Sequence, residues 1–228
     1  LEMVALAQPQ MRIRFSTSNP QDMTTEVLYA MTKHDNICNH IHLPVQSGSS
    51  RILKEMNRLH TREEYMALID TVRSILPDCG ISQDMIIGFP TETEQDHQDT
   101  LSLMDYVKYD FGFMFMYSER PGTMAARKME DDVPDAVKKQ RLSEIIQRQR
   151  EHSAYRTKQF LSKTVEVLIE KESKKSAQHW SGRTPQNTVV VFPKEHYQPG
   201  DFVMVQIDDC TSATLIGTPL SFSETQNA

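Results

Sequence analysis

The chain has 228 residues, of which 38% are hydrophobic and 25% are charged, and this composition is typical of a folded globular protein. No apolar stretch approaches the roughly 20 residues that a helix needs to cross a bilayer, so the sequence excludes a membrane span. Three cysteines, Cys38, Cys79 and Cys210, are too scattered for a disulfide framework or a C-x-x-C motif, which favours the cytoplasm.

The formal net charge of −6 argues against a polyanion-binding protein, but the charge is unevenly spread. Residues 135–183 hold 12 Lys and Arg against 6 Asp and Glu, whereas the rest of the chain holds 13 against 25. A basic segment in an acidic chain is either a nucleic-acid-binding surface or a solvated helix of mixed charge. Charge alone favours the solvated helix.

Apolar periodicity predicts strands alternating with helices in the first half of the chain. Because Leu1–Ala7 resembles the end of a helix, we expect the chain to be part of a longer protein. Four parallel strands with right-handed crossovers cannot close an eight-stranded barrel, so we expect part of an open or incomplete barrel. The predicted elements are a strand over 12–18, a helix over 24–31, a strand over 38–45, a short helix over 50–56, a helix capped by Thr61 and ended by Pro77, a strand over 81–89, a helix capped by Thr91 or Thr93 and a strand over 111–117.

Polar and small residues follow two of these strands. Gln46 and Ser47 end the second, and Gly88 and Glu92 follow the third. Ligand sites form where loops leave the carboxyl ends of parallel strands, and glycine permits close backbone approach. The alternative to ligand binding is turn chemistry for Ser47 and helix capping for Thr93. Asp84, inside the third strand, is either a hydrogen-bonding centre or a site residue.

Cys38, His40 and His42 alternate and therefore share one face of the second strand. Three possible ligands without a fourth nearby are weak evidence for a metal site, and buried packing with one hydrogen-bonded histidine is favoured.

The second half of the chain changes character after Asp131. Pro134 suits the first turn of a long helix that ends near Phe160, with Val137, Leu142, Ile145 and Ile146 apolar and basic residues facing outward. The period then becomes two, which predicts strands over 164–170, 188–192, 202–207 and 214–216. Short strands at this spacing favour a small antiparallel barrel of the kind that binds oligonucleotides. The polar tail after Leu220 is expected to be disordered.

Cations surround the single tryptophan of the chain. Lys171, Lys174, Lys175 and Arg183 bracket Trp180. An exposed tryptophan beside cations is a platform for stacking RNA bases, whereas the alternative is a charged hairpin loop over a buried tryptophan. With Arg148 of the long basic helix, these residues form the predicted RNA-binding set.

Five strings of the sequence carry a resemblance to a known family. They are Arg12–Pro20 (RIRFSTSNP), His40–Ser49 (HIHLPVQSGS), Asp84–Thr93 (DMIIGFPTET), Tyr117–Thr123 (YSERPGT) and Gly182-Arg183-Thr184 with Asn187, Val190 and Phe192. Together they resemble the radical SAM methylthiotransferases, most closely the MiaB type, which modifies isopentenylated adenosine beside the tRNA anticodon. The fold implied is α/β, a partial parallel (β/α) barrel of the radical SAM type followed by a small antiparallel, OB-like TRAM barrel. The implied domains are residues 1–134 (partial barrel), 135–159 (linking helix), 160–222 (TRAM domain) and 223–228 (tail).

The resemblance implies reductive cleavage of S-adenosyl-L-methionine (SAM) to a radical that abstracts hydrogen from an adenine carbon, followed by sulfur insertion and methylation. It implies tRNA, through its anticodon stem-loop, as partner, and two 4Fe-4S clusters in the full-length enzyme. No C-x-x-x-C-x-x-C motif occurs in this chain, so no residue is assigned to a cluster and we expect the chain alone to be inactive. The residues that the resemblance places on the SAM side are Ser16, Ser18, Gln46, Ser47, Gly88, Glu92 and Tyr117.

Two alternatives remain open at this point. One is a RimO-type methylthiotransferase that acts on a ribosomal protein. The other is a non-enzymatic RNA-binding adaptor built on a decayed barrel.

Overall fold

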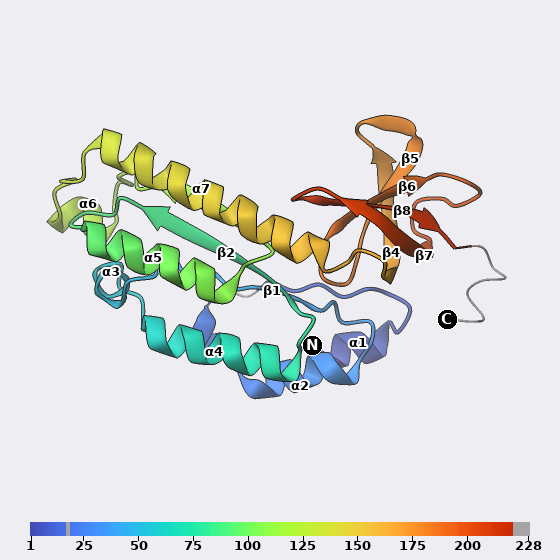
Figure 1. Ribbon diagram of the computed structural model, residues 1–228. Coiled ribbons are helices and arrows are strands. Elements are labelled where there is room, and N and C mark those ends of the chain that lie inside the picture. Colours follow the sequence, from blue (N-terminus) through green and yellow to red (C-terminus); the bar gives the residue numbers. More distant parts are fainter. Residues whose placement is uncertain (17–18, 221–228) are drawn as a thin grey trace.

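A computed structural model describes residues 1–16 and 19–220 of the chain. Its first part is a parallel sheet backed by helices, and its second part is a closed barrel of strands (Figure 1). The elements of the first part are α1 (Glu2–Ala7), η1 (Pro20–Asp22), α2 (Thr25–Lys33), β1 (His40–His42), α3 (Ser50–Glu55), α4 (Arg62–Ile75), β2 (Gly80–Ile87), α5 (Glu94–Val107), β3 (Phe111–Met116), α6 (Met124–Lys128) and α7 (Asp135–Lys158). Those of the barrel are β4 (Thr164–Ser173), β5 (Ser176–Arg183), β6 (Val189–Pro193), β7 (Phe202–Cys210) and β8 (Thr214–Pro219).

The sheet of the first part has the order β1-β2-β3, and both pairings are parallel. The prediction of parallel strands alternating with helices is therefore confirmed. The two faces of the sheet differ. Ile41, Ile81 and Met85 point to one face and pack into a core with α4 and α5 residues such as Tyr65 and Leu101. The residues between them, which include His42 and Asp84, point to the opposite face.

The predicted strand over Arg12–Ser18 is wrong for the part that the structure describes. Only Ile13 forms a bridge, with Ile37, and the end of the predicted strand, residues 17–18, lies outside the described residues. The alternating arginines of this segment serve another purpose. Arg12 donates hydrogen bonds to the carbonyl of Arg183 at 2.5 Å and to Glu166 at 2.6 Å, which ties the segment to the barrel.

Local capping signals were read correctly. Thr61 and Glu64 form a reciprocal capping box at the start of α4, as predicted. At α5 the choice between Thr91 and Thr93 falls on Thr93, whose hydroxyl accepts from the amide of Asp96 while the Asp96 carboxylate accepts from the amide of Thr93.

Helix α7 differs from the prediction in which side chains it buries. It packs against α5 and β3, but its buried face is mostly polar, with Lys138 and Arg141 only 3% and 6% exposed. The prediction that its basic residues face outward is therefore wrong for these two, because both find carboxylate partners in the first part. None of the described helices, α7 included, is long and apolar enough to span a membrane.

The barrel has the strand order β4-β5-β6-β8-β7 and closes on itself. β5 was missed, because its sequence SAQHWSGR is polar and resembles a loop. Gly182, taken as a loop residue, lies in β5 where a Cβ atom would overlap the carbonyl oxygen of Leu168 on β4. One pairing also departs from the predicted antiparallel barrel, since β6 and β8 are parallel. The predicted tail over 223–228 lies outside the described residues.

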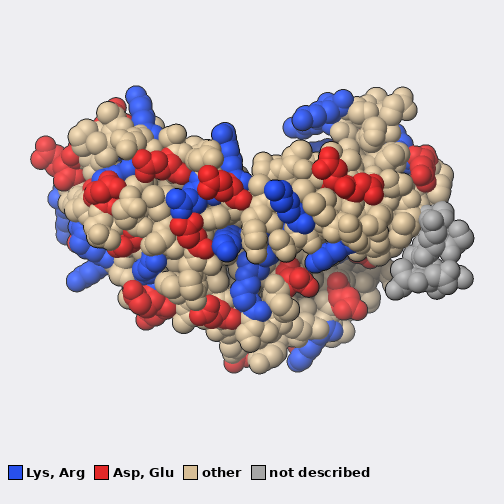
Figure 2. Space-filling view, in the orientation of Figure 1, with Lys and Arg blue, Asp and Glu red and all other residues tan. Residues whose placement is uncertain are grey.

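Charged side chains are distributed differently over the two parts. In Figure 2, Asp, Glu, Lys and Arg are interspersed over the helices of the first part. At the tip of the barrel, near the turn between β4 and β5, Lys and Arg side chains gather on one side.

Candidate functional site

The carboxyl ends of the parallel strands bring three predicted site residues to one edge of the sheet. The amide of Gln46 donates to the carbonyl of Asp84 at 2.9 Å, and the carbonyl of Gln46 accepts from Ile86 at 2.9 Å. The amide of Tyr117 donates to the carbonyl of Ile87 at 2.7 Å, one residue before Gly88. Gln46, Gly88 and Tyr117 therefore lie on adjacent strand ends.

The backbone at this edge adopts unusual conformations. Gln46 and Gly88 have φ angles of 74° and 71°, in the left-handed region that disfavours side chains. Glycine is the residue type that fits position 88, because a Cβ atom there would also overlap Cγ of Lys138 on α7. Strained backbone of this kind concentrates at ligand sites, where the surrounding structure holds it in place.

A pocket of about 440 Å³ opens beside this edge. Ile86 and Phe89 line it from the end of β2, and Phe115, Met116 and Tyr117 line it from the end of β3. Phe89 and Tyr117 meet edge to face with ring centroids 5.2 Å apart. The lining is mainly apolar, which suits a flat heteroaromatic ligand.

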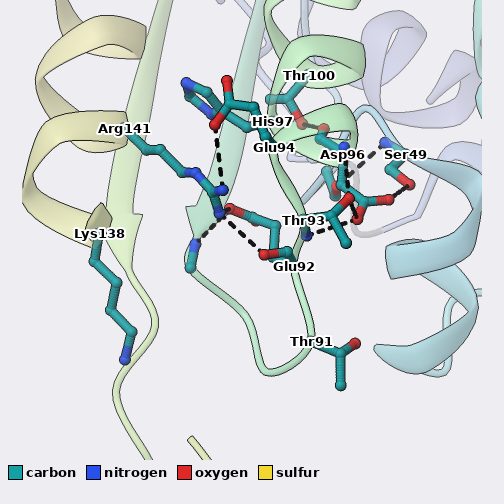
Figure 3. Close-up of polar contacts among 12 residues, drawn as sticks. Ser49, Thr91, Glu92, Thr93, Glu94, Asp96, His97, Thr100, Lys138 and Arg141 are labelled. Carbon is teal, nitrogen blue, oxygen red and sulfur yellow. Dashed lines mark hydrogen bonds and ion pairs between the residues drawn. The ribbon is translucent and has the colours of Figure 1, made fainter. Parts of the chain in front are cut away.

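Glu92 holds the loop between β2 and α5 from within. Its carboxylate accepts from the amide of Gly88 at 3.0 Å and from Arg141 at 2.9 Å, and its side chain is 1% exposed (Figure 3). Burial raises the pKa of Glu92, while the Gly88 amide and the Arg141 guanidinium oppose that rise. The carboxylate is thus occupied with its own loop, and direct contact between Glu92 and a ligand stays a prediction.

Asp96 fixes the other end of the same loop to α3. It accepts from Ser49 at 2.6 Å, from Arg51 at 2.5 Å and from the hydroxyl of Thr93 at 2.6 Å (Figure 3). Burial alone would raise the pKa of Asp96, but the hydrogen bonds from Arg51, Ser49 and Thr93 hold it well below its usual range.

Lys138 closes the loop from the side of α7. Its ammonium group pairs with Asp131 at 2.5 Å and lies 5.5 Å from the ring centroid of Tyr117. Residues 88–96 are therefore held to α3 through Asp96 and to α7 through the buried pair of Glu92 and Arg141. Of the other predicted SAM-side residues, Ser47 is 1% exposed and its hydroxyl accepts from the amide of Ser49, Ser16 is exposed, and Ser18 lies outside the described residues.

The predicted RNA-binding residues separate into two groups. Lys171, Lys174, Lys175 and Arg183 line one groove of about 490 Å³ on the barrel. Trp180 points away from this groove, because it neighbours the groove residues His179 and Ser181 on an alternating strand.

Trp180 is not the exposed platform that was considered. Its side chain is half-buried, its Nε1–H donates to the carbonyl of Tyr197 at 3.0 Å, and Lys194 lies 4.4 Å above its ring. Arg148, on α7, pairs with Asp105 and lies 3.7 Å from Glu151. Its charge is therefore compensated within the chain.

The comparisons with known proteins agree with this architecture. Residues 1–104 match the family model of the radical SAM superfamily, and residues 158–220 match that of the TRAM domain. Over 98% of its length the chain is 68% identical to the tRNA-2-methylthio-N(6)-dimethylallyladenosine synthase of Christiangramia forsetii and 66% identical to that of Flavobacterium psychrophilum. Over nearly its whole length the chain is therefore similar to radical SAM methylthiotransferases. It spans about half the length of these relatives, 47% of each.

A solved structure shares the fold of this chain. Coproporphyrinogen III oxidase of Escherichia coli, a radical SAM enzyme, superposes with a TM-score of 0.50 at 16% identity, covering 74% of this chain and 45% of the oxidase. The predicted boundaries at residues 134 and 159 stay predictions, although the TRAM match begins at residue 158.

The cysteines of this chain do not fit an iron–sulfur cluster. Cys38 and Cys79 are buried and free, and burial raises the pKa of the Cys79 thiol to about 12 and that of Cys38 above its usual value. Thiolates, not thiols, ligate metals. Among the described residues no group of three or more His, Cys, Asp or Glu side chains is arranged to hold a metal ion, which includes Cys38 with His40 and His42.

The sequence did not predict the residues whose partners lie far away along the chain. Arg141 and Arg51 hold the loop between β2 and α5 and Lys138 packs against Gly88, yet each resembles an ordinary helix-surface cation in the sequence. A usable signal was present for Arg141 and Lys138, since they lie four and seven residues before the buried Ile145, on the same face of α7 as the apolar stripe.

Proposed function

We propose that this chain is the C-terminal part of an enzyme that adds a methylthio group to N6-isopentenyladenosine beside the tRNA anticodon. The observation that carries the proposal is the 68% identity to a relative of that name, over a chain in which Gln46, Gly88 and Tyr117 lie on adjacent strand ends. With tRNA as substrate, the protein would act in the cytoplasm.

The strand-end pocket is the proposed site for the adenosyl group of SAM. Apolar side chains such as Ile86 and Phe89 would contact the faces of the adenine, and the backbone around Tyr117 would hydrogen-bond its edge. SAM supplies the radical chemistry and the methyl group when bound, and this chain's residues position it and exclude water. The proposed SAM-side residues are Ser16, Ser18, Gln46, Ser47, Gly88 and Tyr117, with Glu92 acting by holding the loop.

The two 4Fe-4S clusters of the full-length enzyme are proposed to bind outside this chain, because its thiols do not fit them. We therefore expect the 228-residue chain, purified and incubated anaerobically with iron, sulfide and reductant, to leave SAM intact. Reductive cleavage of SAM by this chain alone would contradict the assignment.

The groove of the barrel is the proposed contact for tRNA phosphates. Lys171, Lys174 and Lys175 line it with exposed charges, whereas Arg183 is half-exposed and lies 3.4 Å from Glu170 of the same groove. Cations around a groove bind polyanions by neutralising phosphates and releasing counterions. Arg148 and Trp180 are proposed only as flanking contacts, since the former is ion-paired and the latter is half-buried.

A nucleoside digest tests the function. In a strain that lacks the full-length protein, tRNA hydrolysates analysed by mass spectrometry are expected to lose the methylthio nucleoside and to accumulate the isopentenylated one. Full-length protein restores the product in the complemented strain. If the methylthio nucleoside persists in the deletion strain, the proposed function is wrong.

A further inference from the structure

The helix-free face of the parallel sheet carries a cluster of polar side chains that lies below the strand-end pocket. On this face His40 and His42 of β1 neighbour Ser82 and Asp84 of β2. The other face is filled by the core with α4, α5 and α7, so the cluster plays no part in that packing. Side chains of His42 and Asp84 remain 21% and 31% exposed.

The side chains of the cluster are connected through the hydroxyl of Ser82. The hydroxyl oxygen of Ser82 lies 3.1 Å from Nε2 of His40 and 2.9 Å from Nδ1 of His42, and a carboxylate oxygen of Asp84 lies 3.5 Å from Nε2 of His42. A single hydroxyl donates to one imidazole and accepts from the other. When Nε2 of His42 carries its proton, Ser82 donates to Nδ1 of His42 and accepts from His40. Asp84, 3.5 Å from Nε2 of His42, is a partly exposed acceptor on this face.

Aromatic rings lie next to this acceptor. Phe111, Phe113 and Phe115 of β3 pair with Ser82, Asp84 and Ile86, so they share the same face. Phe111 is stacked on His40 with ring centroids 5.4 Å apart, whereas Phe113 and Phe115 are 55% and 54% exposed. Phe113 is thus an open ring directly beside Asp84.

We propose that Asp84, oriented by His42, and Phe113 form a subsite for the adenine ring of the target nucleoside, an inference that rests on the proposed function. Phe113 stacks on the ring, and the Asp84 carboxylate accepts from its exocyclic N–H. An aromatic face beside a carboxylate recognises a flat ring that bears a hydrogen-bond donor, and a base turned out of an RNA loop is read in this way.

The position of the subsite favours the target base over the adenine of SAM. The pocket proposed for SAM begins at Ile86 and Phe115 and extends toward Phe89 and Tyr117, beyond the strand ends. Asp84 and Phe113 each precede that pocket by two residues on their strands, about 7 Å deeper along the sheet. Two flat ligands can therefore occupy neighbouring positions on one face, as a reaction between SAM and a base requires.

Equilibrium binding of RNA to the full-length protein tests the subsite. The probes are two anticodon stem-loops that differ only at the target position, one with isopentenyladenosine and one abasic. The wild type is expected to prefer the first. Asp84→Asn and Phe113→Ala each reduce that preference by about tenfold and leave the affinity for the abasic RNA unchanged. Asp35→Asn, at an exposed turn, is the matched control and preserves the preference.

Other outcomes separate the possible failures. Asp84→Asn that binds both RNAs like the wild type overturns the subsite, and so does equal loss for both RNAs together with a lower melting temperature. That second result means that another segment of the full-length protein covers this face. Loss of SAM affinity with an intact base preference assigns the site to the adenine of SAM and also overturns the proposal. If the wild type forms methylthio product but Asp84→Asn shows no defect, only the subsite fails, whereas a wild type without product refutes the proposed function itself.

Discussion

In the first part of the molecule Glu92, Arg141 and Asp96 are buried and paired, whereas in the barrel Lys171 and Lys174 stand exposed around a groove. The buried charges hold a loop in a conformation that its backbone disfavours. The exposed charges hold nothing and remain available to a polyanion. We therefore propose that the same residue types position a small-molecule site in one part and bind nucleic acid in the other, and that burial sets the difference.

The largest effect is expected from Arg141→Ala, which leaves the buried carboxylate of Glu92 without its partner. Breaking a buried pair in this way costs about 3–5 kcal/mol of unfolding free energy. Urea denaturation of the full-length protein measures it. Arg150→Ala, exposed on the same helix, is the control and is expected to change stability by less than about 0.5 kcal/mol. Equal stability of the two variants would show that the pair does not hold the loop.

Gly88→Ala is expected to have the next largest effect. It forces a side chain into the left-handed region and against Lys138, at a cost of about 1–3 kcal/mol, and is expected to weaken SAM binding. Gly122→Ala separates the two causes, because Gly122 has a φ of 86° with no atom within 4 Å of the added Cβ. Calorimetric SAM titration and thermal melts should show a larger defect for Gly88→Ala. The same defect in both variants would mean that Lys138 does not matter.

Removing three groove cations together, Lys171, Lys174 and Lys175 to Ala, is expected to weaken tRNA binding uniformly across sequences. The slope of log affinity against log salt concentration should fall by about 1 for each lysine that contacts a phosphate. Fluorescence titrations at several salt concentrations measure both quantities. The triple variant Lys33, Lys54 and Lys128 to Ala removes the same charge from exposed positions in the first part. If it weakens binding as much, the groove is not the contact.

The smallest effect is a change in the pH dependence of stability. The pKa of Asp96 is lowered in the folded state, so its contribution is present above the unfolded pKa of about 3.9 and is lost as pH falls through the folded value. The pKa of Glu92 is raised, so the strain of its ionised form is relieved as pH falls. Urea midpoints below pH 5 should therefore fall less steeply for Asp96→Asn than for wild type, and more steeply for Glu92→Gln. Parallel curves for all three proteins would contradict these directions.

The sequence predicted the features that depend on neighbouring residues. The capping box of Thr61 and Glu64, the cap at Thr93 and the glycine after β2 all follow from local backbone chemistry. The convergence of Gln46 and Gly88 followed from one topological rule, that parallel strands end at the same edge.

The rest depended on partners far along the chain. Arg141 is buried because Glu92 lies 49 residues earlier, and no pattern within α7 records that pairing. Arg12 and Arg14 donate hydrogen bonds to carbonyls of the barrel, so the segment that was predicted as a strand links the first part to the barrel instead. β5 is polar because its outward residues line the groove, so hydrophobic alternation could not reveal it.

The central claim is that the first part binds SAM and the barrel binds tRNA. Parallel titrations of SAM and tRNA against three full-length proteins test it most directly. The proteins are the wild type, Gly88→Ala and the triple variant of Lys171, Lys174 and Lys175. Gly88→Ala is predicted to lose affinity for SAM alone, and the lysine variant to lose affinity for tRNA alone. If the lysine variant lost SAM affinity, or Gly88→Ala lost tRNA affinity to the same extent as SAM affinity, the separation between a loop-holding part and an RNA-binding part would be contradicted.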